Sequence, residues 1–114
     1  MSDCVFCKIA RGEIPCNKVY EDEKVLAFDD IHPMAPVHVV MIPKNHISTL
    51  MDVATEKDNI MNHLMAAAQK VAKIKKIDAS GFRTAINCNA EGGQVVFHLH
   101  VHVLGGRKLQ DELG

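Results

Sequence analysis

The stretch VVFHLHVHVLGG, residues 95–106, carries a histidine at every second position: His98, His100 and His102. Side chains alternate between the two faces of a strand, so this spacing predicts a strand with all three imidazoles on one face. The other face is expected to lie under a long helix and consists of Phe97, Leu99, Val101 and Val103. A slip of one residue would exchange the two faces, and the pattern therefore fixes the register of this strand.

The row of imidazoles allows three interpretations. It can be the solvated polar face of an edge strand, or a His-x-His pair that ligates zinc. It can also be a phosphate-handling site, where one neutral ring attacks phosphorus and a neighbouring ring donates hydrogen bonds. One ion cannot readily bind all three rings, because the Cα atoms of His98 and His102 would be about 13 Å apart. The upstream Gly92 and Gly93 favour the phosphate site, since glycine lets backbone N–H groups approach an anion.

The rest of the chain predicts two helices, a hairpin and two strands. They are a short helix within 4–15, a hairpin within 18–30, a strand at 38–43, a long helix that begins at Thr55 with Asp58 as its capping partner and ends near Ile77, and a strand at 81–87. Clustered strands with one long helix favour an α+β fold with a mainly antiparallel sheet over repeated βαβ units.

Composition limits the class of protein. A chain of 114 residues suggests one domain. The net charge of −1 argues against a broad electrostatic grip on nucleic acid. No apolar run approaches the roughly 20 residues of a membrane span, and the N-terminus lacks the layout of a secretory signal. We therefore expect a cytoplasmic protein, with the nucleus as the alternative, whose four cysteines are thiols or metal ligands.

Four lysines crowd the last turns of the predicted long helix: Lys70, Lys73, Lys75 and Lys76. Cations at the C-terminal end of a helix offset the helix dipole. Solvated lysines in that structural role are the favoured interpretation, ahead of a nucleic-acid patch.

The segment HLHVHVL matches the histidine triad pattern, in which three histidines alternate with apolar residues. Further segments agree in order and spacing: CVFCKIARGEIP, LAFDDIHPMAPVH, IPKNHI, GGQ and HVLGG. Over nearly its full length the chain resembles the Hint branch of the histidine triad (HIT) family, nucleoside phosphoramidases also described as protein kinase C inhibitor-like. The resemblance implies one HIT domain over residues 1–114, with a five-stranded antiparallel sheet, one short N-terminal helix and one long helix.

The resemblance also implies an activity, the hydrolysis of purine nucleoside 5′-phosphoramidates and related nucleotidyl conjugates. His100 maps to the nucleophile, which forms a nucleotidyl-histidine intermediate that water resolves to the monophosphate. His102 maps to the residue that binds phosphate and assists the leaving group, and His38 to a histidine beside the triad. The chemical step requires no metal, because imidazoles and backbone N–H groups can hold the phosphate oxygens.

Substrate-binding positions follow from the same resemblance. Asp30 maps to the carboxylate that accepts the ribose hydroxyls. The other positions are the base pocket of Phe6, Phe28 and Ile31, and the phosphate or sugar contacts of Asn87, Gly93, Gln94 and Val95. The chain departs from its relatives in two ways: Val95 stands where serine is common, and its C-terminal tail has no aromatic residue. Preference on the leaving-group side is therefore expected to differ.

A structural zinc ion is implied as well. Its ligands map to Cys4, Cys7, His46 and His98, a Cys₂His₂ set that would close the coordination tetrahedron. The expected partners are a purine nucleotide (AMP, GMP or their phosphoramidates) and a second copy in a homodimer, with neither nucleic acid nor a membrane. Three alternatives remain at this point: a dinucleoside polyphosphate hydrolase, a nucleotide-binding regulatory module with incidental turnover, and a zinc-dependent hydrolase.

Overall fold

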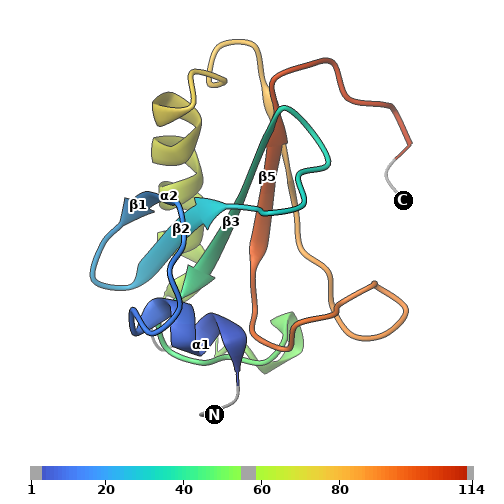
Figure 1. Ribbon diagram of the computed structural model, residues 1–114. Coiled ribbons are helices and arrows are strands. Elements are labelled where there is room, and N and C mark those ends of the chain that lie inside the picture. The colour runs from blue at the N-terminus through green and yellow to red at the C-terminus, as the bar shows by residue number, and fades with distance from the viewer. Residues whose placement is uncertain (1–3, 55–58, 113–114) are drawn as a thin grey trace.

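The computed structural model describes residues 4–54 and 59–112. Its elements in chain order are α1 (Val5–Ala10), β1 (Lys18–Glu21), β2 (Val25–Asp29), β3 (Val37–Pro43), the 3₁₀ turn η1 (Leu50–Asp52), α2 (Ile60–Ile74), β4 (Phe82–Ala85) and β5 (Val101–Gly105). Figure 1 shows α2 running along one side of the sheet and α1 near one end of it.

The strands form one sheet in the order β1-β2-β3-β5-β4. Every neighbouring pair is antiparallel. The β1–β2 hairpin turns at Asp22, whose carboxylate accepts the backbone N–H groups of Lys24 and Val25. The predicted α+β fold, a five-stranded antiparallel sheet with one short and one long helix, is confirmed.

The two faces of the sheet bury different partners. The face toward α2 presents Val39, Met41, Val101 and Val103 to the apolar side of that helix. The opposite face buries Leu26, Phe28, Val40 and Ile42 against the half-buried side chains of α1. Since successive strand residues alternate faces, His38 on β3 and His102 on β5 lie on the α1 side. The two helices thus cover the apolar side chains on both faces of the sheet. His38 and His102 add polar side chains to the face on the α1 side.

The end of α2 differs from the prediction. The helix ends at Ile74 rather than near Ile77. Lys76 adopts a left-handed conformation with φ of 61°, and the N–H of Ile77 donates to the carbonyl of Ala72. This is a Schellman closure, which turns Ile77 back into the core beyond the last helical residue. The predicted start of the helix, Thr55 with Asp58, lies outside the described residues.

The histidine strand is shorter than predicted. β5 begins at Val101, and residues 95–100 are irregular. The ladder between β3 and β5 starts at the pair Met41 and Val101, while the N–H of Leu99 donates to the carbonyl of Ile47, beyond β3. Because residues 95–100 leave the sheet, Phe97 is 47% exposed, and its predicted burial under α2 is wrong.

Within the described residues, no helix is both long and apolar enough to cross a membrane.

Candidate active site

The histidine row divides between two clusters instead of forming one solvated face. His98 joins Cys4, Cys7 and His46, and His102 joins Asp30 and His38. His100 lies between them, with its ring centroid 5.1 Å from that of His102. His98 is fully buried and His100 is 7% exposed, so a solvated polar face is excluded for these two imidazoles.

The hydrogen bond of His100 defines its tautomer. Its Nδ1 lies 2.7 Å from the carbonyl oxygen of His98. A carbonyl oxygen can only accept, so the proton of the neutral ring is on Nδ1 and Nε2 carries the lone pair. The Phe6 ring stands edge-on to the imidazole at a centroid distance of 5.1 Å. In the neutral ring of His100, Nε2 therefore carries the lone pair.

The hydrogen bonds of His38 and His102 define two further tautomers. The backbone N–H of Met34 donates to Nδ1 of His38 at 3.0 Å, so the proton of neutral His38 is on Nε2. That Nε2 lies 2.9 Å from Nδ1 of His102, which accepts the hydrogen bond. Neutral His102 must then carry its own proton on Nε2. The chain of hydrogen bonds ends with an N–H donor on His102, beside the lone pair of His100.

Asp30, His38 and His102 come close enough to suggest a metal site, but their hydrogen bonds do not fit one. A metal ion at Nε2 of His38 would require a lone pair there and a proton on Nδ1. Nδ1 already accepts the N–H of Met34, and Nε2 lies within 3.4 Å of the Asp30 carboxylate. The hydrogen bonds of this cluster therefore do not fit the coordination of an ion.

Burial keeps these imidazoles neutral. Desolvation, together with the smaller effects of the neighbouring His100 and His38, lowers the pKa of His102 to about 4 against the opposing charge of Asp30. Desolvation also lowers the pKa of His38, again opposed by Asp30. Both rings are thus neutral at neutral pH, and each carries a single ring proton, on Nε2.

A pH dependence of stability follows from His102. In the unfolded state His102 has an ordinary pKa near 6.5, whereas in the folded state it binds a proton only near pH 4. The unfolded state binds more protons in this window, so the free energy of unfolding falls as the pH drops from 6.5 toward 4, by up to about 1.4 kcal/mol per pH unit for this one group. Urea unfolding between pH 7 and 4 should show a shallower dependence in His102→Asn than in the wild type. Identical slopes for the two proteins would contradict the assignment.

In the second cluster, ring nitrogens of His46 and His98 face the cysteine sulfur atoms, as a metal site needs. Nε2 of His98 donates to the carbonyl of Pro43 at 2.8 Å, which leaves the lone pair on Nδ1. This Nδ1 lies 3.4 Å from Sγ of Cys4 and 3.6 Å from Sγ of Cys7. Nδ1 of His46 lies 3.2 Å from Sγ of Cys7. Both rings thus present the same nitrogen to the two sulfur atoms.

These distances match tetrahedral coordination. Zinc bonds of about 2.3 Å to sulfur and about 2.0 Å to nitrogen place neighbouring ligand atoms about 3.5 Å apart. The four ligand atoms all lie within 4.8 Å of one another. Burial raises the pKa of the Cys7 thiol, and a bound cation would reverse that effect by favouring the thiolate. The residues present fit a zinc ion with no open coordination position.

An apolar pocket adjoins the histidines. Its volume is about 340 Å³, and Asp30 lies at its edge with the predicted base-pocket residues Phe6, Phe28 and Ile31. Further apolar lining that the sequence did not single out comes from Val5, Ile9, Ile14, Cys16 and Val40. These residues belong to α1, to the segment after it and to β3, so only the fold brings them together.

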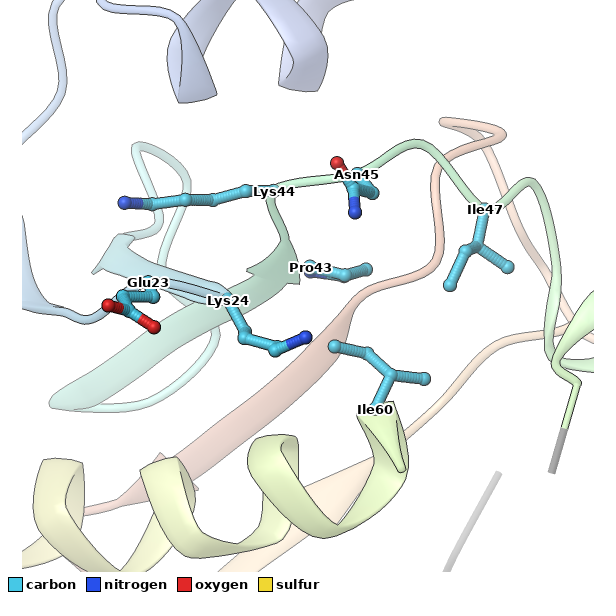
Figure 2. A pocket seen from close by; sticks show the side chains of 7 residues that line it. All are labelled: Glu23, Lys24, Pro43, Lys44, Asn45, Ile47 and Ile60. Atoms are coloured by element: carbon cyan, nitrogen blue, oxygen red, sulfur yellow. The ribbon is translucent and has the colours of Figure 1, made fainter. Parts of the chain in front are cut away.

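A separate cavity of about 230 Å³ lies where β2, β3 and the first turn of α2 meet (Figure 2). Figure 2 shows Pro43, Ile47 and Ile60 around it, with the side chain of Lys24 extending toward Ile60. None of the predicted catalytic or substrate-binding residues lines this cavity. It is therefore not part of the histidine site.

The loop before the histidines is held by its own polar side chains. Gln94 is 6% exposed, and its Nε2 donates to the carbonyls of Ser48 and Val96 while its Oε1 accepts the N–H of Asn89. The amide of Asn87 donates to the carbonyl of Gly92. Gln94 thus holds the loop through both of its polar atoms, and Asn87 through its amide nitrogen.

Val95 and the two glycines form the accessible part of this loop. Val95 is 87% exposed. A Cβ at Gly92 would lie 2.5 Å from the carbonyl oxygen of Cys88, and Gly93 has a φ of 80°. A side chain at Gly92 would clash with Cys88 and one at Gly93 would be strained, and the N–H of Gly93 donates within the loop to the carbonyl of Ala90.

Comparisons of the sequence with known proteins identify relatives of this chain. A family model described as the HIT domain matches residues 11–109. The purine nucleoside phosphoramidase of Escherichia coli K12 is 43% identical over 107 residues, which cover 94% of this chain and 90% of the relative. An uncharacterized HIT-like protein of Buchnera aphidicola is 47% identical over 106 residues, 93% of each chain.

Solved structures agree as well. A histidine triad protein from Clostridium difficile superposes with a TM-score of 0.95 at 48% identity, covering 98% of this chain and 97% of that one. A HIT family hydrolase from Legionella pneumophila superposes with a TM-score of 0.94 at 44% identity, covering 98% and 100%.

Proposed function

The chain belongs to the HIT family, and from this we propose that it hydrolyses purine nucleoside 5′-phosphoramidates and related nucleotidyl conjugates to the nucleoside monophosphate. One observation carries the proposal. The lone pair of His100 at Nε2 stands beside the N–H donor of His102, and the hydrogen bonds to backbone atoms and to His38 hold both rings in these tautomers. A nucleophile next to a neutral donor is the arrangement that displacement at phosphorus requires.

The reaction takes two displacements. Nε2 of His100 forms a bond to phosphorus, the P–N bond to the amine breaks, and the departing nitrogen takes up a proton from water. Water then breaks the bond between phosphorus and Nε2, which releases the monophosphate and restores neutral His100. During the first step the imidazole becomes cationic, and the carbonyl oxygen of His98 stabilises it through the hydrogen bond to Nδ1.

His102 contributes as a hydrogen-bond donor and not as a proton carrier. Its pKa of about 4 keeps it neutral at physiological pH, and a neutral imidazole does not release its remaining N–H proton. Nε2–H can therefore donate to a phosphoryl oxygen or to the departing nitrogen throughout the reaction. His38 orients this donor by occupying Nδ1 of His102.

Substrate contacts are assigned to the surroundings of the histidines. Asp30 would accept the ribose hydroxyls, and its Oδ1 is already positioned by the backbone N–H of His32 at 2.7 Å. Phe6, Phe28 and Ile31 would enclose the purine in the apolar pocket. The phosphate would lie against the loop of Asn87, Gly93, Gln94 and Val95. Since the Gln94 side chain is taken up by loop contacts, its part is to hold that loop.

The remaining features belong to the same proposal. Cys4, Cys7, His46 and His98 would hold a structural zinc ion that joins α1 to the segment before β5 and takes no part in the reaction. Residues 1–114 would form one HIT domain that acts in the cytoplasm as a homodimer. The position of β4 at the edge of the sheet supports pairing with a second copy.

A substrate comparison tests the function. We expect the wild type to release AMP from adenosine 5′-phosphoramidate with a kcat/KM at least about tenfold above its value for diadenosine polyphosphates, because the apolar pocket accommodates one base. Chromatography of the products measures both reactions. The reverse preference would favour the dinucleoside polyphosphate hydrolase. Binding of AMP without turnover of either substrate would favour the regulatory module.

A further inference from the structure

We infer that a groove at the C-terminal end of α2 binds an anion that carries two or more phosphoryl groups. The groove has a volume of about 470 Å³. Its polar lining consists of Lys75, Lys76, Ser80, Arg107 and Lys108. No carboxylate lines the groove within residues 4–54 and 59–112.

The helix dipole accounts for only part of this charge. Lys75 and Lys76 follow the last turn of α2, where cations offset the negative end of a helix. Arg107 and Lys108 come from the segment after β5, which has no helix to complement. The whole chain has a net charge of −1. Cations from separate segments therefore converge on one groove of a protein that is not basic as a whole.

Two of the cations are available to a ligand. Nζ of Lys75 contacts the carboxylate of Asp29 at 2.9 Å, and Nζ of Lys108 contacts that of Asp111 at 3.6 Å. Among the residues that the structure describes, no carboxylate lies within ion-pair distance of Lys76 or Arg107. One guanidinium nitrogen of Arg107 donates to the carbonyl of Lys108, and the other N–H groups remain for a ligand. Lys76 and Arg107 are thus the principal candidates for binding.

The chemistry of these side chains favours phosphate. A guanidinium group presents paired donors that match two oxygens of one phosphoryl group, and an ammonium group adds a point charge. Ser80 offers a hydroxyl in the same groove. Several cations around a cavity of this size suit more than one phosphoryl group. The groove shares no lining residue with the apolar pocket or with the histidines, so this inference does not depend on the proposed function.

Titration with inorganic tripolyphosphate, followed by two-dimensional amide NMR of the ¹⁵N-labelled protein, tests the inference. Glycine amides report on the two regions separately: Gly81 and Gly106 line the groove, and Gly92 and Gly93 lie in the loop of the histidine site. We expect saturable shifts at Gly81 and Gly106 at low ionic strength that weaken at about 0.15 M salt. Inorganic phosphate serves as a further probe. Binding of tripolyphosphate without binding of inorganic phosphate would show a requirement for linked phosphoryl groups, and equal binding of the two would show a general affinity for anions.

Paired variants complete the experiment. Lys76→Gln with Arg107→Gln should raise the dissociation constant measured at Gly81 and Gly106 at least about tenfold. Lys70→Gln with Lys73→Gln removes the same charge from α2 outside the groove and should leave the constant within about twofold. Dispersed amide spectra verify that each variant is folded.

Three results would overturn the inference. Tripolyphosphate could shift only Gly92 and Gly93, which would place the anion at the histidine site. Both double variants could lose affinity equally, which would reduce the effect to net charge. Finally, single-stranded RNA could bind the groove while tripolyphosphate does not, which would identify a nucleic-acid surface.

Discussion

His100→Ala should lower kcat for the release of AMP from adenosine 5′-phosphoramidate by at least about 10⁴-fold, with a much smaller change in KM. The variant keeps the apolar pocket, Asp30 and the donor of His102, so the substrate can still bind. It loses the lone pair at Nε2 that the hydrogen bond of Nδ1 to the carbonyl of His98 leaves free. Water would have to attack phosphorus directly, without a covalent intermediate.

Two measurements separate loss of the nucleophile from loss of structure. Acid quenching of the wild type with excess substrate should trap a protein whose mass is raised by one nucleotidyl group, and the variant should show no such species. Substitution of the half-buried His63 on α2 by alanine removes an imidazole remote from the site and should leave kcat within about twofold. Turnover by His100→Ala within tenfold of the wild type would refute a nucleophilic role.

Much of the fold could be predicted from local pattern. The hairpin, the strand that ends at Pro43 and the position of the long helix follow from periodicity and from turn residues. The end of α2 could not, because Lys76 has no sequence signature for the left-handed conformation that closes the helix. The start of β5 depends on where its partner β3 stops, which is a property of the pairing and not of the alternation His-x-His.

The candidate site, like the fold, could be predicted only in part from the sequence. The resemblance supplied the residue types, and the structure brings them into two clusters. The tautomers come from backbone groups that carry no side-chain signal: the carbonyls of His98 and Pro43 and the N–H of Met34. The groove formed by Lys76 and Arg107 was equally hidden, since the lysines alone are explained by the helix dipole.

Loss of zinc should produce the largest change in stability. We expect about one zinc ion per chain in the wild type and almost none in Cys7→Ser, with a Tm lower by about 10 °C or more. The physical reason is that Cys7 comes from α1, His46 from the segment after β3 and His98 from the segment before β5. Four bonds to one ion would connect these segments, and their removal would leave α1 with its apolar contacts to the sheet.

Cys16→Ser is the matched control. Cys16 is a half-buried free cysteine outside the four-residue cluster, whereas Cys7 is buried. It should retain zinc and change Tm by no more than a few degrees. Atomic emission measures the metal content, and calorimetry with and without a chelator measures Tm. A wild type that contains no zinc, and whose Tm does not rise when zinc is added, would refute the site.

The same variants distinguish a structural ion from a catalytic one. All four coordination positions are filled by protein atoms, so a bound ion would have no place for water or substrate. Below its lowered Tm, Cys7→Ser should therefore keep a measurable rate of AMP release, within about 100-fold of the wild type, whereas His100→Ala should not. A metal-free protein that is folded but fully inactive would instead support the zinc-dependent hydrolase. These results would assign the His98 cluster to stability and His100 to the chemical step.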